Sequence, residues 1–498
     1  MMNCRQWVLC IPHGRLLRAA ENRDCEMMAR RYTRMILFCI SSLLIFSILF
    51  GRFTECGYAM TTDEEKKMGK KVLLEIEKEA DIIKDLSVQA FVEKVGCSLV
   101  DQVGPTPFEF KFFVMNVPDA NAFAIPGGYI FVTTGLLVLA ESEQEIAAVL
   151  SHEISHVTQR HIAQMIERSK RLNIATLAAM VAAMLAGRGG AGSQAGVAMA
   201  TATAGALQLK YTREMETDAD QNGLHLLIKA GYDPNGMINF FNRLQKVSLA
   251  MAPNIPQYLL THPVIENRIS LLENLLQMGP KPSGPFKTFR DFKKVRAKAF
   301  VEEREAHVAV THFQSLIDAN SDYWEGYYGL GLAYRKMGRF DKSLEVLQRA
   351  RSLAPEDLDI SRELAITYFL LGRMDQAIEN LEAIRSARDE GRTSDLMILY
   401  YLGRGYQEKG DFAKALPLLL KVQKEKPEFA DIYYHLGSVY GRTGQKGLSH
   451  FYFGKHFKLR WEKNNALLHF RTAIDWLERG SPEREEAQRE IKELTSPQ

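Results

Sequence analysis

A repeat of 34 residues constrains the second half of this chain more than any other feature. Each unit carries a Leu followed by a small residue, then a Tyr and a Gly at fixed distances. These sets are Leu330-Gly331, Tyr334 and Gly338; Leu364-Ala365, Tyr368 and Gly372; Leu402-Gly403, Tyr406 and Gly410; and Leu436-Gly437, Tyr440 and Gly444. The spacing is 34 residues, with four extra residues before the third set. A fixed period of this length predicts stacked helical units.

These units resemble tetratricopeptide repeats. The resemblance implies an α-solenoid of helix pairs over residues 323–457, followed by C-terminal helices and a charged tail over residues 458–498. Small residues allow the two helices of a unit to cross closely, while Tyr and Leu fill the core between units. Such a stack has a concave groove, so we expect it to bind a protein partner, with a passive scaffold as the alternative.

The first half of the chain contains the pentapeptide His152-Glu153-Ile154-Ser155-His156. Residues four apart lie on one face of a helix, so both histidines can bind one Zn²⁺ and Glu153 can activate a metal-bound water. Ser142 and Glu145 predict a capped helix start. Neither Pro nor Gly interrupts the run before Gly187, so we expect the histidines inside a helix. His161 is out of register with them and is expected at the surface.

A catalytic zinc site needs a third protein ligand. The extension with glycine at position 159 and histidine at position 162 is absent, because the chain has Gln159 and Ile162. Glu216 and Asp220 are again four apart on a helix. Glu216 can bind the metal, while Asp220 can accept the second N–H of a ligand histidine and fix its tautomer. Two neighbouring acids fit a solvated face instead: Glu214 and Asp218.

Together these motifs resemble the M48 family of zinc metallopeptidases. Residues 121–135 resemble the strand–turn–strand segment before the family's active-site helix, and residues 261–269 resemble its downstream His-Pro…Arg element. The resemblance covers residues 60–277 and implies a gluzincin-like protease domain, mainly α with a small β-sheet. When the repeats are included, the chain most resembles the periplasmic, repeat-bearing M48 proteases that take part in outer-membrane protein quality control.

The resemblance also implies the chemistry of the site. It implies one Zn²⁺ per chain, with Glu153 as the general base. The metal ligands would be His152, His156 and Glu216. His262 is the first candidate for stabilising the oxyanion of the tetrahedral intermediate. In some relatives the equivalent histidine instead takes the fourth metal position and holds the enzyme off, and both roles stay open. Arg268 is expected to pair with an acidic residue near the site, with a substrate contact as the alternative.

Two segments suggest how a polypeptide substrate is held. Ala122–Ile125 and Tyr129–Thr133 are β-prone runs joined by a Pro-Gly-Gly turn signal. An edge strand there could pair with an extended peptide, with an ordinary hairpin as the alternative. The segment Leu172–Leu209 is rich in Ala, Gly and Met. It is expected to form a helical hairpin near the site, or else a mobile lid or a peripheral membrane contact.

The N-terminus has the pattern of a secretory signal peptide. Met35–Phe50 is an apolar run of 16 residues, preceded by three Arg and followed by small residues that a signal peptidase reads. We therefore expect residues 1–59 to be a signal peptide and the mature protein to lie in the periplasm. A retained inner-membrane anchor is the alternative. A start at Met27 or Met28 would give a leader of ordinary length, so residues 1–26 are expected to precede the true start.

Composition limits the remaining functions. The leader holds eight Arg, no Lys and four acids, so its removal changes the net charge from +3 to about −1 and leaves Cys97 as the single cysteine. We therefore expect no disulfide, no cysteine metal site and no nucleic-acid partner. Residues 278–322 are expected to be a linker and a basic helix. Six Lys or Arg in Lys287–Lys298 predict a solvated face, with contact to acidic lipid headgroups as the alternative.

The sequence thus predicts an exported zinc-dependent endopeptidase that hydrolyses peptide bonds in misfolded or unassembled envelope proteins. The repeats would recruit the polypeptide substrate or a protein partner. Two alternatives are a chaperone or scaffold with a self-inhibited protease domain, and a protease anchored in the inner membrane.

Overall fold

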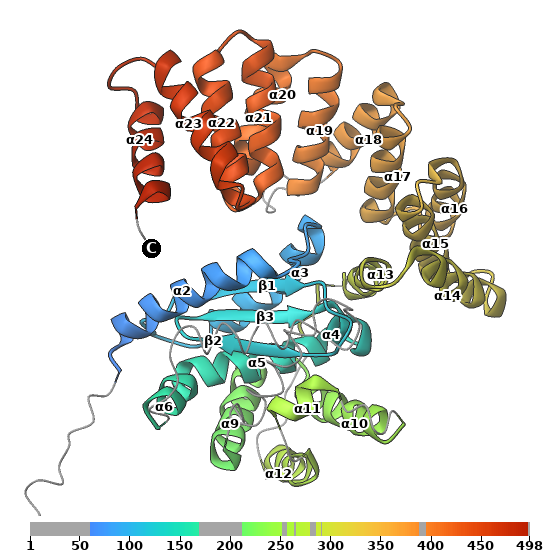
Figure 1. The fold of residues 1–498 in the computed structure, drawn as a ribbon. Helices are drawn as coiled ribbons and strands as arrows, with labels where there is room; N and C mark the ends of the chain where they lie inside the picture. The colour runs from blue at the N-terminus through green and yellow to red at the C-terminus, as the bar shows by residue number, and fades with distance from the viewer. Residues whose placement is uncertain are drawn as a thin grey trace, which may run out of the picture. The chain divides into compact units, whose positions relative to one another are not determined.

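The computed structural model describes residues 60–168, 212–250, 256–262, 265–278, 285–289, 291–387 and 395–496. All of them belong to one unit, residues 60–498. The signal peptide expected at residues 1–59 and the segment Leu172–Leu209 lie outside the described residues. Within the described part, no helix is both long and apolar enough to cross a membrane. The predicted fold class, mainly helical with a small sheet, is confirmed (Figure 1).

A three-stranded sheet lies within the first half of the described chain. Its strands are β1 (Lys111–Met115), β2 (Ala122–Ile125) and β3 (Tyr129–Thr133), in the order β1-β3-β2. β1 is parallel to β3 and β2 is antiparallel to it. The turn between β2 and β3 requires glycine at Gly128, where φ is 97° and a Cβ would lie 2.5 Å from the carbonyl oxygen of Glu109. The expected hairpin forms, and β2 is an edge strand whose four residues are buried.

Helices pack on both faces of this sheet. α2 (Thr62–Glu79) and α3 (Leu86–Val100) lie on one face, and α5 (Glu143–Thr158) lies on the other (Figure 1). The short helix α4 (Thr134–Leu139) follows β3 directly. Buried apolar side chains from all of these elements form one continuous core. This core holds α5, which carries the H-E-x-x-H pentapeptide, in a fixed position against the sheet.

α5 begins where the sequence predicts. Ser142 is the N-cap, and its hydroxyl accepts the N–H of Glu145 at 3.3 Å. The carboxylate of Glu145 accepts two hydrogen bonds from Arg243 of α10 (Asn235–Ala250), each at 3.1 Å. The first half of the capping motif therefore forms, while the glutamate side chain binds another helix.

α5 ends earlier than an uninterrupted helical run would. It stops at Thr158, and a new helix, α6 (His161–Arg168), begins after a corner that contains no Gly or Pro. Arg160 takes a left-handed φ of 55° there. The Arg160 Nε donates at 2.8 Å to Glu65, a buried carboxylate of α2. We infer that this long-range contact stabilises a backbone conformation that is unfavourable for arginine.

Three further helices complete this half of the molecule. α9 (Arg213–Lys229) packs along α5, and α12 (Ile265–Met278) contacts both α9 and α10. The five-residue helix α11 (Gln257–Thr261) ends at its C-cap, His262. α9 is capped by Thr212, whose hydroxyl accepts the N–H of Met215 at 3.3 Å. These helices bring residues from distant parts of the sequence to the buried face of α5.

Paired helices follow, and the 34-residue period predicts those over residues 323–457. They are α13 (Phe292–Glu303), α14 (Ala306–Ala319), α15 (Trp324–Lys336), α16 (Phe340–Leu353), α17 (Leu358–Leu370), α18 (Met374–Ala387), α19 (Leu396–Glu408), α20 (Phe412–Glu425), α21 (Ala430–Arg442), α22 (Lys446–Leu459), α23 (Lys463–Trp476) and α24 (Pro482–Thr495). The last glycine of each repeat follows the first helix of its pair and takes a φ of 70–81°. This left-handed conformation ends the helix and explains why glycine recurs there.

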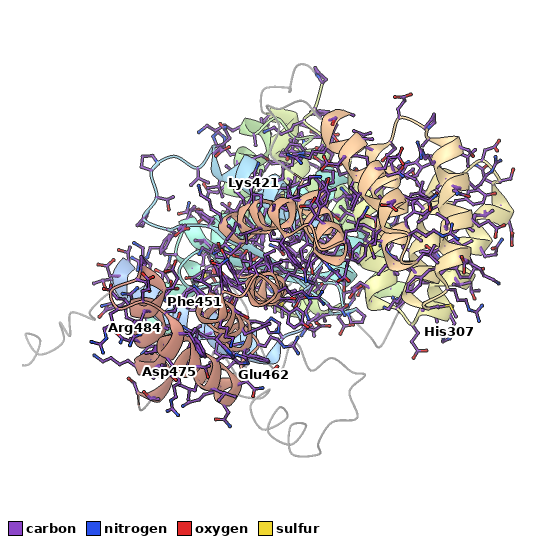
Figure 2. All side chains as sticks on the ribbon, turned by 90° about the horizontal axis from the view of Figure 1, so that it is seen from above. His307, Lys421, Phe451, Glu462, Asp475 and Arg484 are labelled. Carbon is purple, nitrogen blue, oxygen red and sulfur yellow. The ribbon has the colours of Figure 1, made fainter. Side chains whose placement is uncertain are left out.

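The C-terminal helices have a small core of their own. Phe451 of α22 packs against Phe470 of α23, with ring centroids 6.3 Å apart, within the range of about 4.5–7 Å for aromatic pairs. Arg484 of α24 donates to the carbonyl of Leu477 at 2.7 Å, which ties α24 to the end of α23. Figure 2 labels Phe451 and Arg484, together with Glu462, the N-cap of α23, and Asp475 of α23.

The expectation of a solvated basic face at Lys287–Lys298 is wrong for two of its lysines. Lys294 and Lys298 lie on α13 and are only 9% and 6% exposed. Lys298 Nζ lies 2.8 Å from Asp85, the N-cap of α3, and 2.8 Å from Glu363 of α17. Lys294 binds Asp357 at 3.0 Å. These lysines are buried because carboxylates from other helices meet them, which the local charge pattern does not reveal.

Glu363 is the centre of this buried ionic network. It is fully buried and lies 2.7 Å from Arg335 and 3.5 Å from Arg362, in addition to Lys298. Burial alone would raise the pKa of the Glu363 carboxyl, but the three cations outweigh it and lower the pKa to about 2. The network therefore joins α3, α13, α15 and α17 through ion pairs, and the charged form of Glu363 is stabilised by the cations around it.

Candidate metal centre

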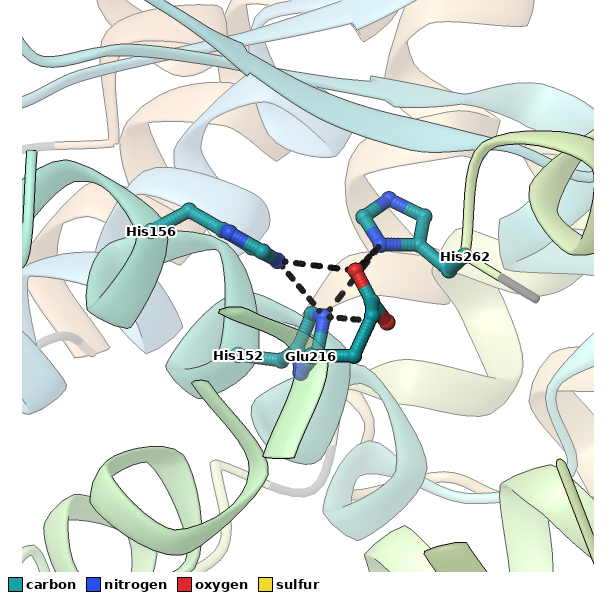
Figure 3. A group of neighbouring side chains, drawn as sticks. All are labelled: His152, His156, Glu216 and His262. Carbon is teal, nitrogen blue, oxygen red and sulfur yellow. Dashed lines mark hydrogen bonds and ion pairs between the residues drawn. The ribbon is translucent and has the colours of Figure 1, made fainter. Parts of the chain in front are cut away.

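α5 presents two histidines to a single buried point. His152 and His156 are 1% and 0% exposed, and their Nε2 atoms lie 2.9 Å apart (Figure 3). The spacing of four residues on one helix face produces this approach. Two imidazole nitrogens at this separation in a buried site can bind one ion together.

α9 brings carboxylates to the same point. Glu216 Oε1 lies 3.5 Å from His156 Nε2, and Glu216 Oε2 lies 3.7 Å from His152 Nε2. One turn further along α9, Asp220 Oδ1 lies 3.0 Å from His152 Nδ1. Asp220 therefore contacts the ring nitrogen that faces away from the cluster, which leaves Nε2 of His152 directed inward.

Gly223 lets α9 approach α5. A Cβ at this position would lie 3.1 Å from the backbone nitrogen of His152. We expect Gly223→Val to displace α9, to lower the free energy of unfolding by about 1–3 kcal/mol, and to weaken metal binding because Glu216 is on the displaced helix. Thermal denaturation and metal titration test this. Gln221→Val, at an exposed position of α9, controls for helix propensity, and equal metal affinity in Gly223→Val would contradict the prediction.

His262 joins the group from the end of α11. Its Nδ1 lies 2.9 Å from Glu216 Oε1 and 3.3 Å from His152 Nε2 (Figure 3). Its ring stacks on Tyr258 with a centroid distance of 4.6 Å. His152, His156, Glu216 and His262 each offer one ligand atom, and these four atoms lie within 4.8 Å of one another. The structure thus brings a fourth donor to the three expected on α5 and α9.

Glu153 lies beside this group. It is fully buried, and neither of its carboxylate oxygens accepts a hydrogen bond from the described residues. Oε1 lies 3.5 Å from His262 Nε2. Burial raises the pKa of the Glu153 carboxyl, and this effect exceeds the opposing influence of His262 and His152. A buried carboxyl of this kind is available to exchange a proton.

Arg268 of α12 ties the two acids of α9 together. Its Nε and Nη2 donate to the two oxygens of Asp220 at 2.6 and 2.7 Å, and its Nη1 lies 2.6 Å from Glu216 Oε2. Burial would raise the pKa values of both carboxyls. For Glu216, His262 and Arg268 outweigh burial and hold the pKa well below its ordinary value. For Asp220, Arg268 outweighs burial and lowers the pKa. Both acids are thus held as carboxylates.

The expectation that His161 lies at the surface is wrong. His161 is 3% exposed, and its Nδ1 lies 2.9 Å from Nδ1 of His156. The corner at Arg160 breaks the register that placed His161 on another helix face. The Nε2 atom of His161 lies 3.2 Å from Asp218 Oδ2. Asp218, which was expected on a solvated face, therefore contacts a protein side chain as well. Sequence reasoning also did not identify Tyr258; its position four residues before His262 was the only available signal.

The donor set fits a zinc ion. Two imidazole nitrogens and a carboxylate oxygen are a common ligand set of catalytic zinc sites. The inward Nε2 atoms and the carboxylate held by Arg268 fit a divalent cation at the point where the four ligand atoms meet. The Glu153 oxygens, which accept no hydrogen bond from the described residues, fit it as well.

Family models match both halves of the chain. Residues 84–276 match peptidase family M48. Residues 295–351 and 328–391 match a tetratricopeptide repeat model. The expected peptidase domain and the expected repeats are therefore confirmed.

Curated relatives share this sequence in part. A Vibrio cholerae protein of the beta-barrel assembly-enhancing protease kind is 34% identical over 313 residues, which are 61% of this chain and 63% of the relative. The beta-barrel assembly-enhancing protease of Escherichia coli is 32% identical over 225 residues, 44% of this chain and 45% of the relative. A mitochondrial metalloendopeptidase of Schizosaccharomyces pombe is 30% identical over 186 residues, 37% of this chain and 52% of the relative. The chain spans less than two thirds of the length of each.

Proposed function

Because the chain contains a peptidase family M48 domain followed by tetratricopeptide repeats, we propose that it is a zinc-dependent endopeptidase. One observation carries the proposal: a buried group of three histidines and a glutamate lies beside the buried carboxylate of Glu153, which accepts no hydrogen bond from the described residues. Metal-assisted hydrolysis of a peptide bond needs ligands, an adjacent base and exclusion of bulk water. The arrangement supplies all three.

A zinc ion held at this site would lower the pKa of a bound water and polarise the scissile carbonyl. The residues that would hold it are His152, His156 and Glu216. Glu153 takes the proton of the attacking water and later gives it to the leaving amine. Asp220 keeps His152 in the tautomer whose Nε2 faces the metal, and Arg268 orients Asp220 and Glu216 through the contacts described above.

His262 has two candidate roles. As an oxyanion donor it would stabilise the tetrahedral intermediate. As a fourth ligand it would exclude water and close the site. The distances from His262 Nδ1 to Glu216 and His152 support the role of fourth ligand in this conformation. This nitrogen lies next to the other atoms that would bind the metal. We propose that His262 must move away before a substrate can be cleaved.

Removal of this side chain tests the role. We expect the full-length chain to hold one zinc per chain, and a chelator to abolish its cleavage of unfolded casein. His262→Ala should keep the zinc and cleave at least several-fold faster, since water can take the vacated position. Zinc content and casein cleavage are measured side by side, with the exposed His225→Ala on α9 as control. Slower cleavage with zinc retained would instead assign His262 to the oxyanion, and absence of zinc from the parent would contradict the proposed function.

We propose that the substrates are misfolded or unassembled outer-membrane proteins and that the enzyme works in the periplasm. The support is the name shared by the bacterial relatives, beta-barrel assembly-enhancing protease, together with the signal-peptide pattern at Met35–Phe50. The repeats would recruit the substrate or an assembly partner. N-terminal sequencing of the mature protein separates a cleaved signal from a retained anchor, and cleavage after Ala59 is expected.

A further inference from the structure

His161 and Asp218 extend the candidate metal centre in a direction that the H-E-x-x-H pattern does not contain. His161 Nδ1 lies 2.9 Å from His156 Nδ1, and His161 Nε2 lies 3.2 Å from Asp218 Oδ2. The two rings are inclined at 72° with centroids 5.0 Å apart. His161 is 3% exposed, whereas the Asp218 side chain is 45% exposed. The three side chains therefore form a chain from the buried ligand to the surface of α9.

The acceptor at the outer end fixes the protons along this chain. An ionised carboxylate only accepts hydrogen bonds, so His161 must carry a proton on Nε2, which faces Asp218. In a neutral imidazole the other nitrogen then has a lone pair, so His161 Nδ1 accepts a hydrogen bond. The donor is His156 Nδ1, which therefore carries its proton. His156 Nε2 is left with a lone pair directed at His152 and Glu216.

We propose that His161 and Asp218 are positioning residues that hold His156 in the one tautomer able to bind the metal, an inference that rests on the proposed zinc site. The two ligand histidines are thereby served by two acids of the same helix. Asp220 reaches His152 directly at 3.0 Å. The Asp218 side chain lies on a different side of α9 and does not contact His156 directly. It contacts His161, and His161 contacts His156. α9 thus supplies the carboxylate ligand, one direct orienting carboxylate and one that acts through a second histidine.

The corner between α5 and α6 makes this arrangement possible. If α5 continued without a break, His161 would follow His156 by five residues and leave the helix in a different direction. Arg160, with its φ of 55° and its contact to Glu65, breaks the helix, and His161, the first residue of α6, contacts His156 of α5. The alternative is that His161 only fills space at this corner, and the experiment separates the two roles.

The experiment compares zinc affinity in the full-length protein by competition with a chromogenic chelator. His161→Phe keeps an aromatic ring but removes both nitrogens, and it should weaken zinc binding about 10- to 100-fold. His161→Asn returns a carbonyl oxygen close to the position of Nδ1, so it should recover most of the affinity. Asp218→Ala should weaken binding less than His161→Phe, and the double variant should be no weaker than His161→Phe alone, because the residues act in series.

Matched controls come from α9 itself. Glu214→Ala and His225→Ala replace exposed residues of the same helix and should bind zinc like the parent. The absorption spectrum of the cobalt-substituted protein gives a second readout, since loss of an oriented His156 alters the ligand field in His161→Phe but not in the controls.

Each outcome decides the proposal. If folded His161→Phe binds zinc as tightly as the parent, or if His161→Asn is as weak as His161→Phe, the hydrogen-bond relay is refuted and His161 is a packing residue. If His161→Phe does not fold, Asp218→Ala against Glu214→Ala decides, and equal affinity overturns the proposal. If the parent itself binds no zinc, the proposed function fails and this inference fails with it, whereas a zinc-binding parent with unaffected variants refutes only the relay.

Discussion

Glu153→Gln is expected to lower the rate of casein cleavage by about 10²- to 10⁴-fold, the usual contribution of a general base, while zinc stays bound. Glutamine has the same size but cannot take a proton from the attacking water. Neither oxygen of Glu153 accepts a hydrogen bond from the described residues, so the substitution breaks no such bond and should not unfold the protein. The measurement is zinc content and cleavage rate on the same preparation.

The matched control is Glu273→Gln, an exposed glutamate of α12, which should cleave like the parent. Parental activity in Glu153→Gln would show that this residue is not the base. The same variant also separates the enzyme from the chaperone alternative. If cells that carry Glu153→Gln behave like cells that carry the parent, cleavage is dispensable and the repeats with a closed protease domain perform the biological role.

Glu363→Gln is expected to lower the free energy of unfolding by about 3–5 kcal/mol, the cost of removing one partner from a buried ion pair. Three cations converge on this fully buried carboxylate: Lys298 at 2.8 Å, Arg335 at 2.7 Å and Arg362 at 3.5 Å. Without the charge, they are left buried with less compensation. Thermal and chemical denaturation measure the loss, and Glu379→Gln, an exposed residue of α18, should leave stability within about 0.5 kcal/mol of the parent.

The same carboxylate predicts a dependence of stability on pH. The pKa of Glu363 is lowered from 4.5 to about 2 in the folded protein, so the folded state favours the charged form. Its contribution to stability is complete above the unfolded-state pKa and is lost as the pH falls from about 4.5 to about 2. The difference in stability between the parent and Glu363→Gln should therefore shrink over this interval. A difference that does not change with pH would contradict the ionic explanation.

The parts of the candidate site that could be predicted from the sequence are pairs of residues within one helix. His152 with His156, and Glu216 with Asp220, were identified because a separation of four residues fixes a common helix face before any packing is known. The meeting of the two pairs was not local: it depends on the crossing of α5 and α9 at Gly223. His262 was named from a resemblance, and its position is set by α11 and the ring of Tyr258.

The sequence by itself determined the repeat architecture, the start of α5 and the paired acids of α9, because a period of 34 residues, an N-cap and a spacing of four act within one or two helices. Only the tertiary structure decided what depends on distant partners. His161 is buried because Arg160 turns the chain against Glu65, 95 residues earlier. Lys298 is buried because Asp85 and Glu363 approach it from other helices. Helical register predicts a solvated His161, and charge predicts a solvated Lys298. Both are buried because a buried carboxylate from a distant part of the chain, Glu65 or Glu363, binds a cation beside or at that position.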